Sequence, residues 1–360
     1  EEMVNEQTYT FIDRGEREVT LRPEMTPTVA RMVAGRRREL SLPVRWYSIP
    51  NLFRYERPQR GRLREHWQLN CDIFGADDYT ADVEIIALAY QIILNFGAEA
   101  NLFAIHINDR AEMRTKYAAL GVIATETQDA ITRLNDRFHK ISADEYKTAL
   151  REIVGDNAIV EAVYTLVSGG DSTDSNKVVD GLRELGIENV KIDRSIARGF
   201  NYYTGTIFEI FDVSGENNRS MLGGGRYDNL TGMFSADPIS GIGFGMGDVT
   251  MRDFLETHDL LTSSITAPTV MVIPMETDQN LAAQKIAMAI RRKEISVATD
   301  IGTRKLGKKI SDAAERLVEY IIVVGEDELT SGTYTLKNLI EESEIKGTLD
   351  ELITHITEAE

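Results

Sequence analysis

The chain has 360 residues, of which 42% are hydrophobic, and its 40 Lys and Arg against 58 Asp and Glu give a formal net charge of −18. This composition excludes a disordered chain, and the length predicts two or three domains. One cysteine excludes an internal disulfide, and one Cys with five His offers no CxxC or HExxH spacing. We therefore expect no metal-ligating residues and a reducing compartment, the cytoplasm. Acidic and amide residues interrupt the apolar stretch Ala81–Phe96, so we expect no membrane span.

The N-terminal part of the chain predicts strands with two helices among them. Residue patterns favour strands at 8–13, 18–21, 44–49, 51–57, 64–74 and 102–107, and helices at 26–37 and 81–96. A block of helices follows, near 109–120, 127–137, 144–154, 156–168 and 173–185. Strands return at 190–193, 206–212 and 219–222. We therefore expect the helical block to interrupt a strand-rich domain.

The C-terminal part has a different organisation. A polar stretch at 262–266, ending at Pro268, predicts a linker. Beyond it, strands at 269–274, 296–299, 320–324 and 333–339 alternate with helices at 278–292, 306–317 and near 349–356. This alternation predicts a small α/β domain with a parallel or mixed sheet.

Arginines are concentrated in one region of this acidic chain. Ten arginines and only two acids lie between Arg31 and Arg64, a local balance of 10 − 2 = +8. A solvated basic face is one explanation, and a polyanion site is the other. The arginines alternate with apolar strand residues, which favours side chains held in place and hence the polyanion site.

The predicted hairpin at 51–74 carries several of these arginines. Because alternate strand residues share a face, Arg54 lies with Glu56, and Gln68 lies with Asp72. Guanidinium groups bind phosphates in a bidentate manner, while the acids and Gln68 suit a cationic group. Exposed cross-strand ion pairs are the alternative, but each stabilises by only about 0–1 kcal/mol, too little to explain five arginines on one hairpin.

Two glycine patterns need separate interpretations. The glycines at 241, 243, 245 and 247 have the period of a strand, so they predict a strand whose bare face accepts something flat, and not a dinucleotide fingerprint. The stretch Gly302–Lys308 matches GxxxxGK, but Lys309 follows where a P-loop needs Ser or Thr. We expect a basic loop there, with Lys308 and Lys309 directed toward solvent or RNA.

These motifs together resemble a known family. Residues 53–62, with Gln68 and Asp72, resemble motif 2 of a class II aminoacyl-tRNA synthetase, specifically of the histidyl-tRNA synthetases. Residues 21–27 and 197–205 resemble the histidine-binding segments of that family, and 223–228 and 241–247 the motifs that close its site. The resemblance implies an α+β fold with the class II antiparallel sheet. It also implies a catalytic domain at 1–108 and 189–261, an inserted helical domain at 109–188, a linker at 262–268 and an α/β anticodon-binding domain at 269–360.

The resemblance also implies roles for individual residues. Glu24 and Thr26 would hold the α-amino group of histidine, with Gln68 nearby. Asp72 and Tyr203 would face its imidazole, and Tyr202 would line the same pocket. For ATP, the expected residues are Arg54, Glu56, Arg62 and His66, with Arg198 as an additional catalytic arginine. The implied reaction activates histidine with ATP and Mg²⁺ to histidyl-adenylate and transfers it to tRNA(His), without a membrane and as a homodimer.

Three features depart from the family pattern. The arginine that normally ends motif 3 is replaced by Thr250, so Arg252 or another basic residue would have to substitute. His66 stands where an aromatic Phe normally stacks on adenine. Motif 1, which forms much of the dimer interface in this class, is not found, and the chain begins with Glu1, so we expect a preceding segment.

Two other functions remain as alternatives. A non-catalytic, synthetase-like regulatory subunit of histidine biosynthesis would explain Thr250, although it typically lacks the anticodon-binding domain that residues 269–360 predict. A class II synthetase for glycine, proline or threonine would share that domain, but the Tyr202-Tyr203 pair argues against it.

Overall fold

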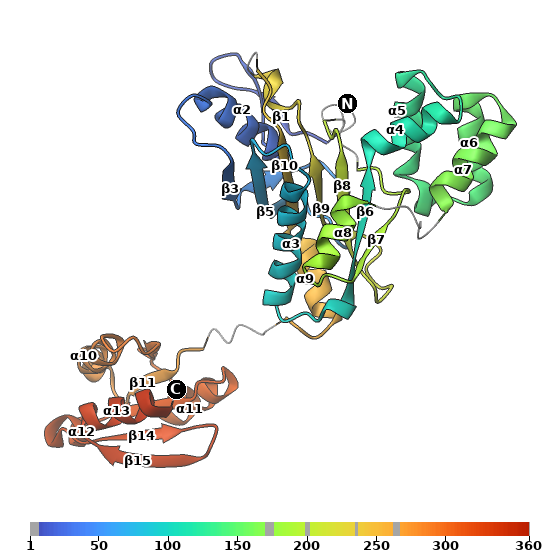
Figure 1. Ribbon diagram of the computed structural model, residues 1–360. Helices are drawn as coiled ribbons and strands as arrows, with labels where there is room; N and C mark the ends of the chain where they lie inside the picture. The colour runs from blue at the N-terminus through green and yellow to red at the C-terminus, as the bar shows by residue number, and fades with distance from the viewer. Residues whose placement is uncertain (1–6, 170–175, 199–201, 235–236, 262–266, 360) are drawn as a thin grey trace. The chain divides into compact units, whose positions relative to one another are not determined.

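The computed structural model describes residues 7–169, 176–198, 202–234, 237–261 and 267–359. The chain divides into two compact units, residues 1–261 and 262–360 (Figure 1). The predicted linker at 262–266 and the start of the helix expected at 173–185 lie outside the described residues. None of the described helices is long and apolar enough to cross a membrane.

The first unit is built on one large sheet. Its strands run in the order β3 (Val44–Ser48), β5 (Glu65–Phe74), β10 (Gly241–Gly247), β9 (Ser220–Arg226), β8 (Thr206–Asp212), β6 (Phe103–Asp109) and β7 (Val190–Ile192), and β4 (Asn51–Phe53) pairs with β5. All neighbours are antiparallel except β6 and β7. The predicted antiparallel sheet is therefore confirmed. Strands β1 (Thr10–Ile12) and β2 (Glu18–Thr20) form a separate hairpin.

Helices α3 (Thr80–Asn95), α8 (Lys177–Glu184) and α9 (Asp248–Thr257) pack on one face of the large sheet (Figure 1). Ile242, Phe244 and Met246 of β10 belong to the same apolar cluster as these helices. Since strand side chains alternate between faces, the glycines at 241, 243 and 245 lie on the opposite face. Helix α2 (Thr26–Arg36) packs in a second apolar cluster with Phe74, Tyr203 and Tyr227.

Four helices form a bundle with its own core: α4 (Arg110–Ala119), α5 (Thr125–Asn135), α6 (Ala143–Val154) and α7 (Asn157–Ser168) (Figure 1). Side-chain caps from Asp109, Ser142 and Asp156 begin three of them. Helix α8 was predicted within the same insertion, which was expected to extend to residue 188. Its apolar residues Val178 and Leu182 instead belong to the cluster of the large sheet, so the packing of the bundle ends before α8.

The second unit has a mixed five-stranded sheet in the order β12 (Val297–Thr299), β11 (Val270–Pro274), β13 (Tyr320–Val324), β14 (Tyr334–Asn338) and β15 (Ser343–Gly347). The first three strands are parallel and the last two join antiparallel. Its helices are α10 (Asn280–Arg291), α11 (Leu306–Glu315), α12 (Glu326–Ser331) and α13 (Leu349–Ala359). Apolar clusters form on both faces of this sheet. The predicted α/β organisation is confirmed, although β15 and α12 were not predicted.

Three local predictions are wrong. Strand β4 ends at Phe53 and does not reach residue 57. The strand expected at 219–222 continues through Gly223–Gly225 to Arg226. Lys309 is buried, with its Nζ 2.9 Å from the carbonyl oxygen of Pro274 and 3.3 Å from that of Asp300, so it does not point toward solvent. Donation to two carbonyls satisfies the ammonium group inside the unit.

Candidate active site

The site lies where the glycines of β9 and β10 leave room above the sheet. A Cβ at Gly243 would lie 2.5 Å from the Cys71 carbonyl oxygen and 2.6 Å from the Tyr227 hydroxyl. A Cβ at Gly225 would lie 2.9 Å from the Tyr203 ring, and one at Gly223 would lie 2.7 Å from the Arg198 guanidinium. These distances are too short for a real Cβ, so only glycine fits. The face expected to be bare is thus occupied by the protein's own polar and aromatic side chains.

Glu24 and Tyr202 form one side of this site. Glu24 precedes α2, and its partly buried carboxylate accepts a hydrogen bond from the Tyr202 hydroxyl. Burial raises the pKa of Glu24, although Tyr202, Arg54 and Arg198 oppose this shift. Burial also raises the pKa of Tyr202 well above its usual value, and the neighbouring acid adds to the shift. A desolvated carboxylate of this kind favours a bound cation, such as an ammonium group.

Asp72, on β5, is paired with Tyr227 from the end of β9. The Asp72 carboxylate accepts a hydrogen bond from the Tyr227 hydroxyl, and only 3% of the residue is exposed. Burial raises the pKa of Asp72 to about 7, against the lowering effect of Tyr227. Tyr227 belongs to the motif 223–228 that was expected to close the site, but no individual role was predicted for it. Its place directly after the Gly223–Arg226 strand was the signal that could have identified it.

Arg198 and Tyr203 lie close to each other and to Glu24. The Arg198 Nη1 lies 2.8 Å from a Glu209 carboxylate oxygen, and its Nη2 lies 3.3 Å from the Gly223 carbonyl oxygen. Burial lowers the pKa of Arg198, but Tyr203 and Glu209 outweigh that effect and raise it. The rings of Tyr202 and Tyr203 lie 4.8 Å apart, and the Tyr203 ring lies 6.4 Å from that of Tyr227. Glu209, which anchors the arginine, was also missed by the sequence interpretation.

Arg54 borders the same group from the hairpin. Its Nε donates to the Pro23 carbonyl oxygen at 2.9 Å, which connects the hairpin to the segment before α2. Burial lowers its pKa, while Glu24 and Glu56 raise it. A desolvated guanidinium of this kind is suited to an anionic ligand.

Three further predicted residues lie on or beside the hairpin. Glu56 and Arg62 form an ion pair at 3.4 Å across the loop. Burial and Arg54 lower the pKa of His66, so its imidazole is biased toward the neutral form that can stack on a base. The Gln68 Oε1 is buried and accepts no hydrogen bond within the described residues. The structure thus brings together Glu24, Asp72, Arg54, Arg198 and the two tyrosines, whereas Thr26 begins α2 without a described side-chain partner.

Two other arginines, Arg219 and Arg252, lie near Thr250, which occupies the position of the missing arginine. Thr250 Oγ1 donates to the Met221 carbonyl oxygen at 2.9 Å, and Arg252 pairs with Glu256 at 2.7 Å on the exposed side of α9. Arg219, in contrast, lies against Gly61 of the hairpin loop, where a Gly61 Cβ would be 2.9 Å from its Cδ. Arg219 and Gly61 line a cavity of about 180 Å³, together with Arg60 and Thr250. No described hydrogen bond or ion pair occupies the Arg219 guanidinium.

An antiparallel sheet with an arginine-bearing hairpin beside a desolvated carboxylate pocket defines the class II aminoacyl-tRNA synthetases. Residues 1–248 match the family model described as histidyl-tRNA synthetase, and 269–359 match that of an anticodon binding domain. Histidine–tRNA ligases of Leptospira biflexa and Thermoplasma volcanium are 40% and 38% identical, over 99% and 94% of this chain and 85% and 82% of theirs. The chain therefore belongs to the histidyl-tRNA synthetase family.

Solved structures support the fold. A histidyl-tRNA synthetase from Nostoc sp. PCC 7120 has a TM-score of 0.79 with 22% identity, covering 98% of this chain and 86% of that one. The Staphylococcus aureus histidyl-tRNA synthetase has a TM-score of 0.70 with 23% identity, covering 97% and 86%. At these identities the likeness concerns the fold alone.

Proposed function

We propose that this chain activates L-histidine with ATP to histidyl-adenylate and transfers the histidyl group to tRNA(His). One observation carries the proposal: the partly buried Glu24 and the buried Asp72 interact with each other above the glycine strands, and Arg54 lies close to Glu24. The carboxylates of Glu24 and Asp72 can bind the α-ammonium group and the ring N–H of an amino acid such as histidine. The guanidinium of Arg54 can bind a phosphate of ATP. The names of the curated relatives agree with this chemistry.

In this proposal the amino-acid pocket has two ends. Glu24 and Thr26 bind the α-ammonium group, with the unpaired Oε1 of Gln68 as a further acceptor. Asp72 accepts from one imidazole nitrogen and the Tyr203 hydroxyl bonds the other, while Tyr202 lines the pocket. The pairing of Asp72 with Tyr227 supports this assignment, since it fixes the carboxylate before the ligand arrives.

ATP would lie along the hairpin. Arg54 contacts the α-phosphate, Arg62 the outer phosphates, Glu56 the adenine, and His66 stacks on the base. We propose that Arg219 supplies the positive charge that Thr250 lacks, because it lies beside the hairpin loop. Burial lowers the pKa of Arg219, and the nearby Arg62 lowers it further, so the two guanidinium groups lie close together. Arg252 is a weaker candidate, since Glu256 already pairs with it.

The chemistry requires charge stabilisation and no general base. The histidine carboxylate is ionised at neutral pH. One of its oxygens forms a bond to the α-phosphorus while the bond from that phosphorus to pyrophosphate breaks. Arg54 and Arg198 would stabilise the negative charge that develops on the phosphate oxygens. The described residues contain no group of three or more His, Cys, Asp or Glu that could hold a metal. We propose that Mg²⁺ binds together with ATP, whose phosphate oxygens are suitable ligands for it.

The second unit supports the tRNA part of the proposal. It matches the anticodon-binding domain, which disfavours the regulatory-subunit alternative. A chain with net charge −18 would bind tRNA through local basic surfaces, so binding should weaken steeply with salt. We further propose the domain division expected from the sequence, with one change: the insertion ends before α8 and does not extend to residue 188. We also propose a cytoplasmic location.

We also propose a homodimer. Tyr47 on β3 and Trp67 on β5 are 75% and 53% exposed, and the nearby Ile49 is 56% exposed. Large apolar side chains exposed together at a sheet edge are typical of a protein–protein interface, and a second copy of this chain would cover them.

Histidine-dependent ATP–pyrophosphate exchange tests the central proposal. We expect exchange with histidine and with none of the other nineteen amino acids. Arg54→Ala should abolish exchange, whereas the matched variant Arg57→Ala, an exposed arginine on the same hairpin, should retain it. Exchange by Arg54→Ala at the normal rate would reject the phosphate assignment. A folded protein that binds histidine without any exchange would instead support the regulatory function.

A further inference from the structure

The junction between β6 and α4 holds the segment that carries Arg198. Asn108 Nδ2 donates to the carbonyl oxygens of Arg194 and Ile196 at 3.2 and 3.0 Å. The next residue, Asp109, caps α4 by accepting from the backbone N–H of Glu112 at 2.8 Å. The first helix of the bundle therefore starts at a point that is already bonded to the active-site segment.

Arg110, the first residue of α4, makes most of the remaining bonds. Its Nη2 donates to the carbonyl oxygens of Ala197 and Arg198, both at 2.8 Å, and its Nη1 to that of Tyr203 at 3.4 Å. Its backbone N–H donates to the Gly205 carbonyl oxygen at 3.0 Å. Its guanidinium also lies 5.9 Å from the centre of the Tyr203 ring. One residue thus bonds the carbonyls of four described residues, Ala197, Arg198, Tyr203 and Gly205.

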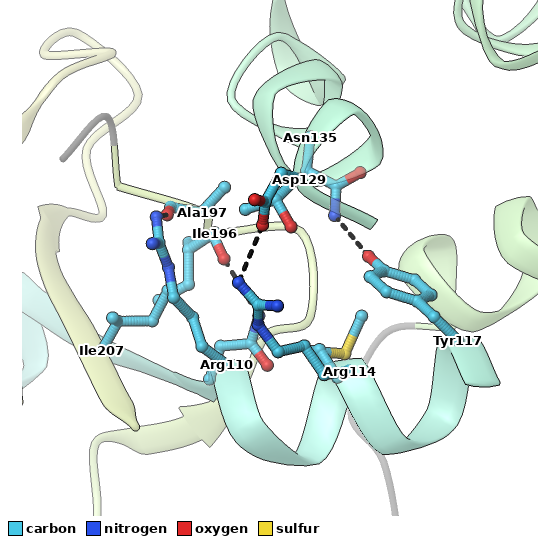
Figure 2. A pocket seen from close by; sticks show the side chains of 11 residues that line it. Arg110, Arg114, Tyr117, Asp129, Asn135, Ile196, Ala197 and Ile207 are labelled. Atoms are coloured by element: carbon cyan, nitrogen blue, oxygen red, sulfur yellow. Dashed lines mark hydrogen bonds and ion pairs between the residues drawn. The ribbon is translucent and has the colours of Figure 1, made fainter. Parts of the chain in front are cut away.

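Arg110 is not an ordinary ion pair of the bundle. No described ion pair joins it to an acid, its Nε is buried without a hydrogen-bond partner, and burial lowers its pKa. Arg114, one turn later on the same helix, pairs with Asp129 of α5 at 2.8 Å. Figure 2 shows the difference: the Arg110 side chain points toward Ala197, and the Arg114 side chain points toward Asp129. Arg110 is only partly buried, and all of the described hydrogen bonds of its guanidinium go to backbone carbonyls, so it holds those carbonyls in place.

The position that these bonds fix is an unusual one. Arg198 has a φ of +48°, in the left-handed region that non-glycine residues seldom adopt. Its carbonyl oxygen is one of those held by Arg110, while its guanidinium extends to Glu209 and Gly223. The carbonyl of Tyr203 is held in the same way. A single planar group therefore sets the backbone of both residues.

We infer that Arg110 is a positioning residue for histidine activation, which makes the first helix of the bundle a structural part of the amino-acid site. The inference rests on the proposed function, in which Arg198 stabilises the charge that develops on the phosphate and Tyr203 binds the imidazole of histidine. Arg110 acts through these two residues and does not touch the substrate itself.

The test compares Arg110→Lys and Arg110→Ala with the matched variant Arg114→Ala in histidine-dependent ATP–pyrophosphate exchange, with histidine and ATP varied separately. A displaced active-site group can cost about 100-fold, so we expect both Arg110 variants to lose roughly that factor in kcat/KM for histidine. Lysine should not restore the rate, because one ammonium cannot reproduce a planar fork that holds three carbonyls. The KM for ATP should stay unchanged, and Arg114→Ala should behave as the wild type.

Thermal unfolding of each variant separates this role from a purely structural one. A lower melting temperature for Arg110→Lys with wild-type kcat/KM for histidine would overturn the inference, as would an equal loss of activity in Arg114→Ala. A Glu24→Gln control keeps the two proposals distinct. If Glu24→Gln leaves histidine binding intact, the assignment of the site fails. If Glu24→Gln weakens it and Arg110→Lys does not, only the role of Arg110 fails.

Discussion

Asp72→Asn should stabilise the first unit at alkaline pH and not at acidic pH. Asp72 is 3% exposed, and burial raises its pKa from 3.8 to about 7. A carboxyl whose pKa is higher in the folded state contributes stability below its unfolded value, and this contribution is lost as the pH rises through about 7. The shift of about 3 pKa units corresponds to roughly 4 kcal/mol, at about 1.36 kcal/mol per unit. Asparagine has nearly the same shape, can still accept from Tyr227 and carries no charge to desolvate.

Urea unfolding followed by tryptophan fluorescence measures this difference. The two tryptophans, Trp46 and Trp67, both lie in the first unit, so the signal does not report on the second. We expect similar free energies of unfolding for both proteins at pH 4, and a difference that grows toward roughly 4 kcal/mol by pH 8 in favour of Asp72→Asn. A difference that does not depend on pH would refute the reasoning. The same variant should lose histidine-dependent exchange, because the ionised acid is the proposed acceptor for the imidazole.

The remaining predictions concern ATP and the glycine strand. Arg219→Ala should raise the KM for ATP in pyrophosphate exchange by about 10- to 100-fold, the value of a charged hydrogen bond, while Arg252→Ala should not, and equal effects would reject Arg219 as the substitute for Thr250. Gly243→Ala should abolish histidine binding measured by calorimetry and lower stability by about 1–3 kcal/mol, because its Cβ would meet the Cys71 backbone. Gly35→Ala, where nothing lies within 4 Å in α2, is the control and should be neutral or stabilising by up to about 1 kcal/mol. Normal histidine binding by Gly243→Ala would contradict the steric argument.

Local patterns were sufficient to predict most of the elements. The period-two glycines correctly predicted β10, and the alternation of strands and helices after Pro268 correctly predicted the second unit. Strand β4 was predicted too long because its end depends on distant partners. Beyond Phe53 the Tyr55 backbone N–H donates to the carbonyl oxygen of Gln7, and no pattern within the hairpin encodes that bond.

Packing partners could not be predicted from local periodicity. Helix α8 has an apolar face like those of the bundle helices, and periodicity does not say which core that face will join. Lys309 was expected in solvent because of its charge, yet two carbonyls provide its partners inside the fold. Asp72 and Tyr227 are 155 residues apart in the sequence, so the hydrogen bond from the Tyr227 hydroxyl to the Asp72 carboxylate was visible only in the structure. The sequence thus predicted which residue types gather at the site, but not which pairs they form.

The glycine strand shows why such pairs matter for function. A missing Cβ predicts free space above a strand, but it does not predict what fills that space. Here Tyr227 and Asp72 lie above Gly243, and Tyr203 lies above Gly225. A side chain at either glycine position would keep these residues farther from the sheet. Their burial raises the pKa of Asp72, Tyr203 and Tyr227. A ligand that donates to Asp72 would stabilise its ionised form. The glycines therefore contribute to binding indirectly, by allowing the acid to be buried before the ligand arrives.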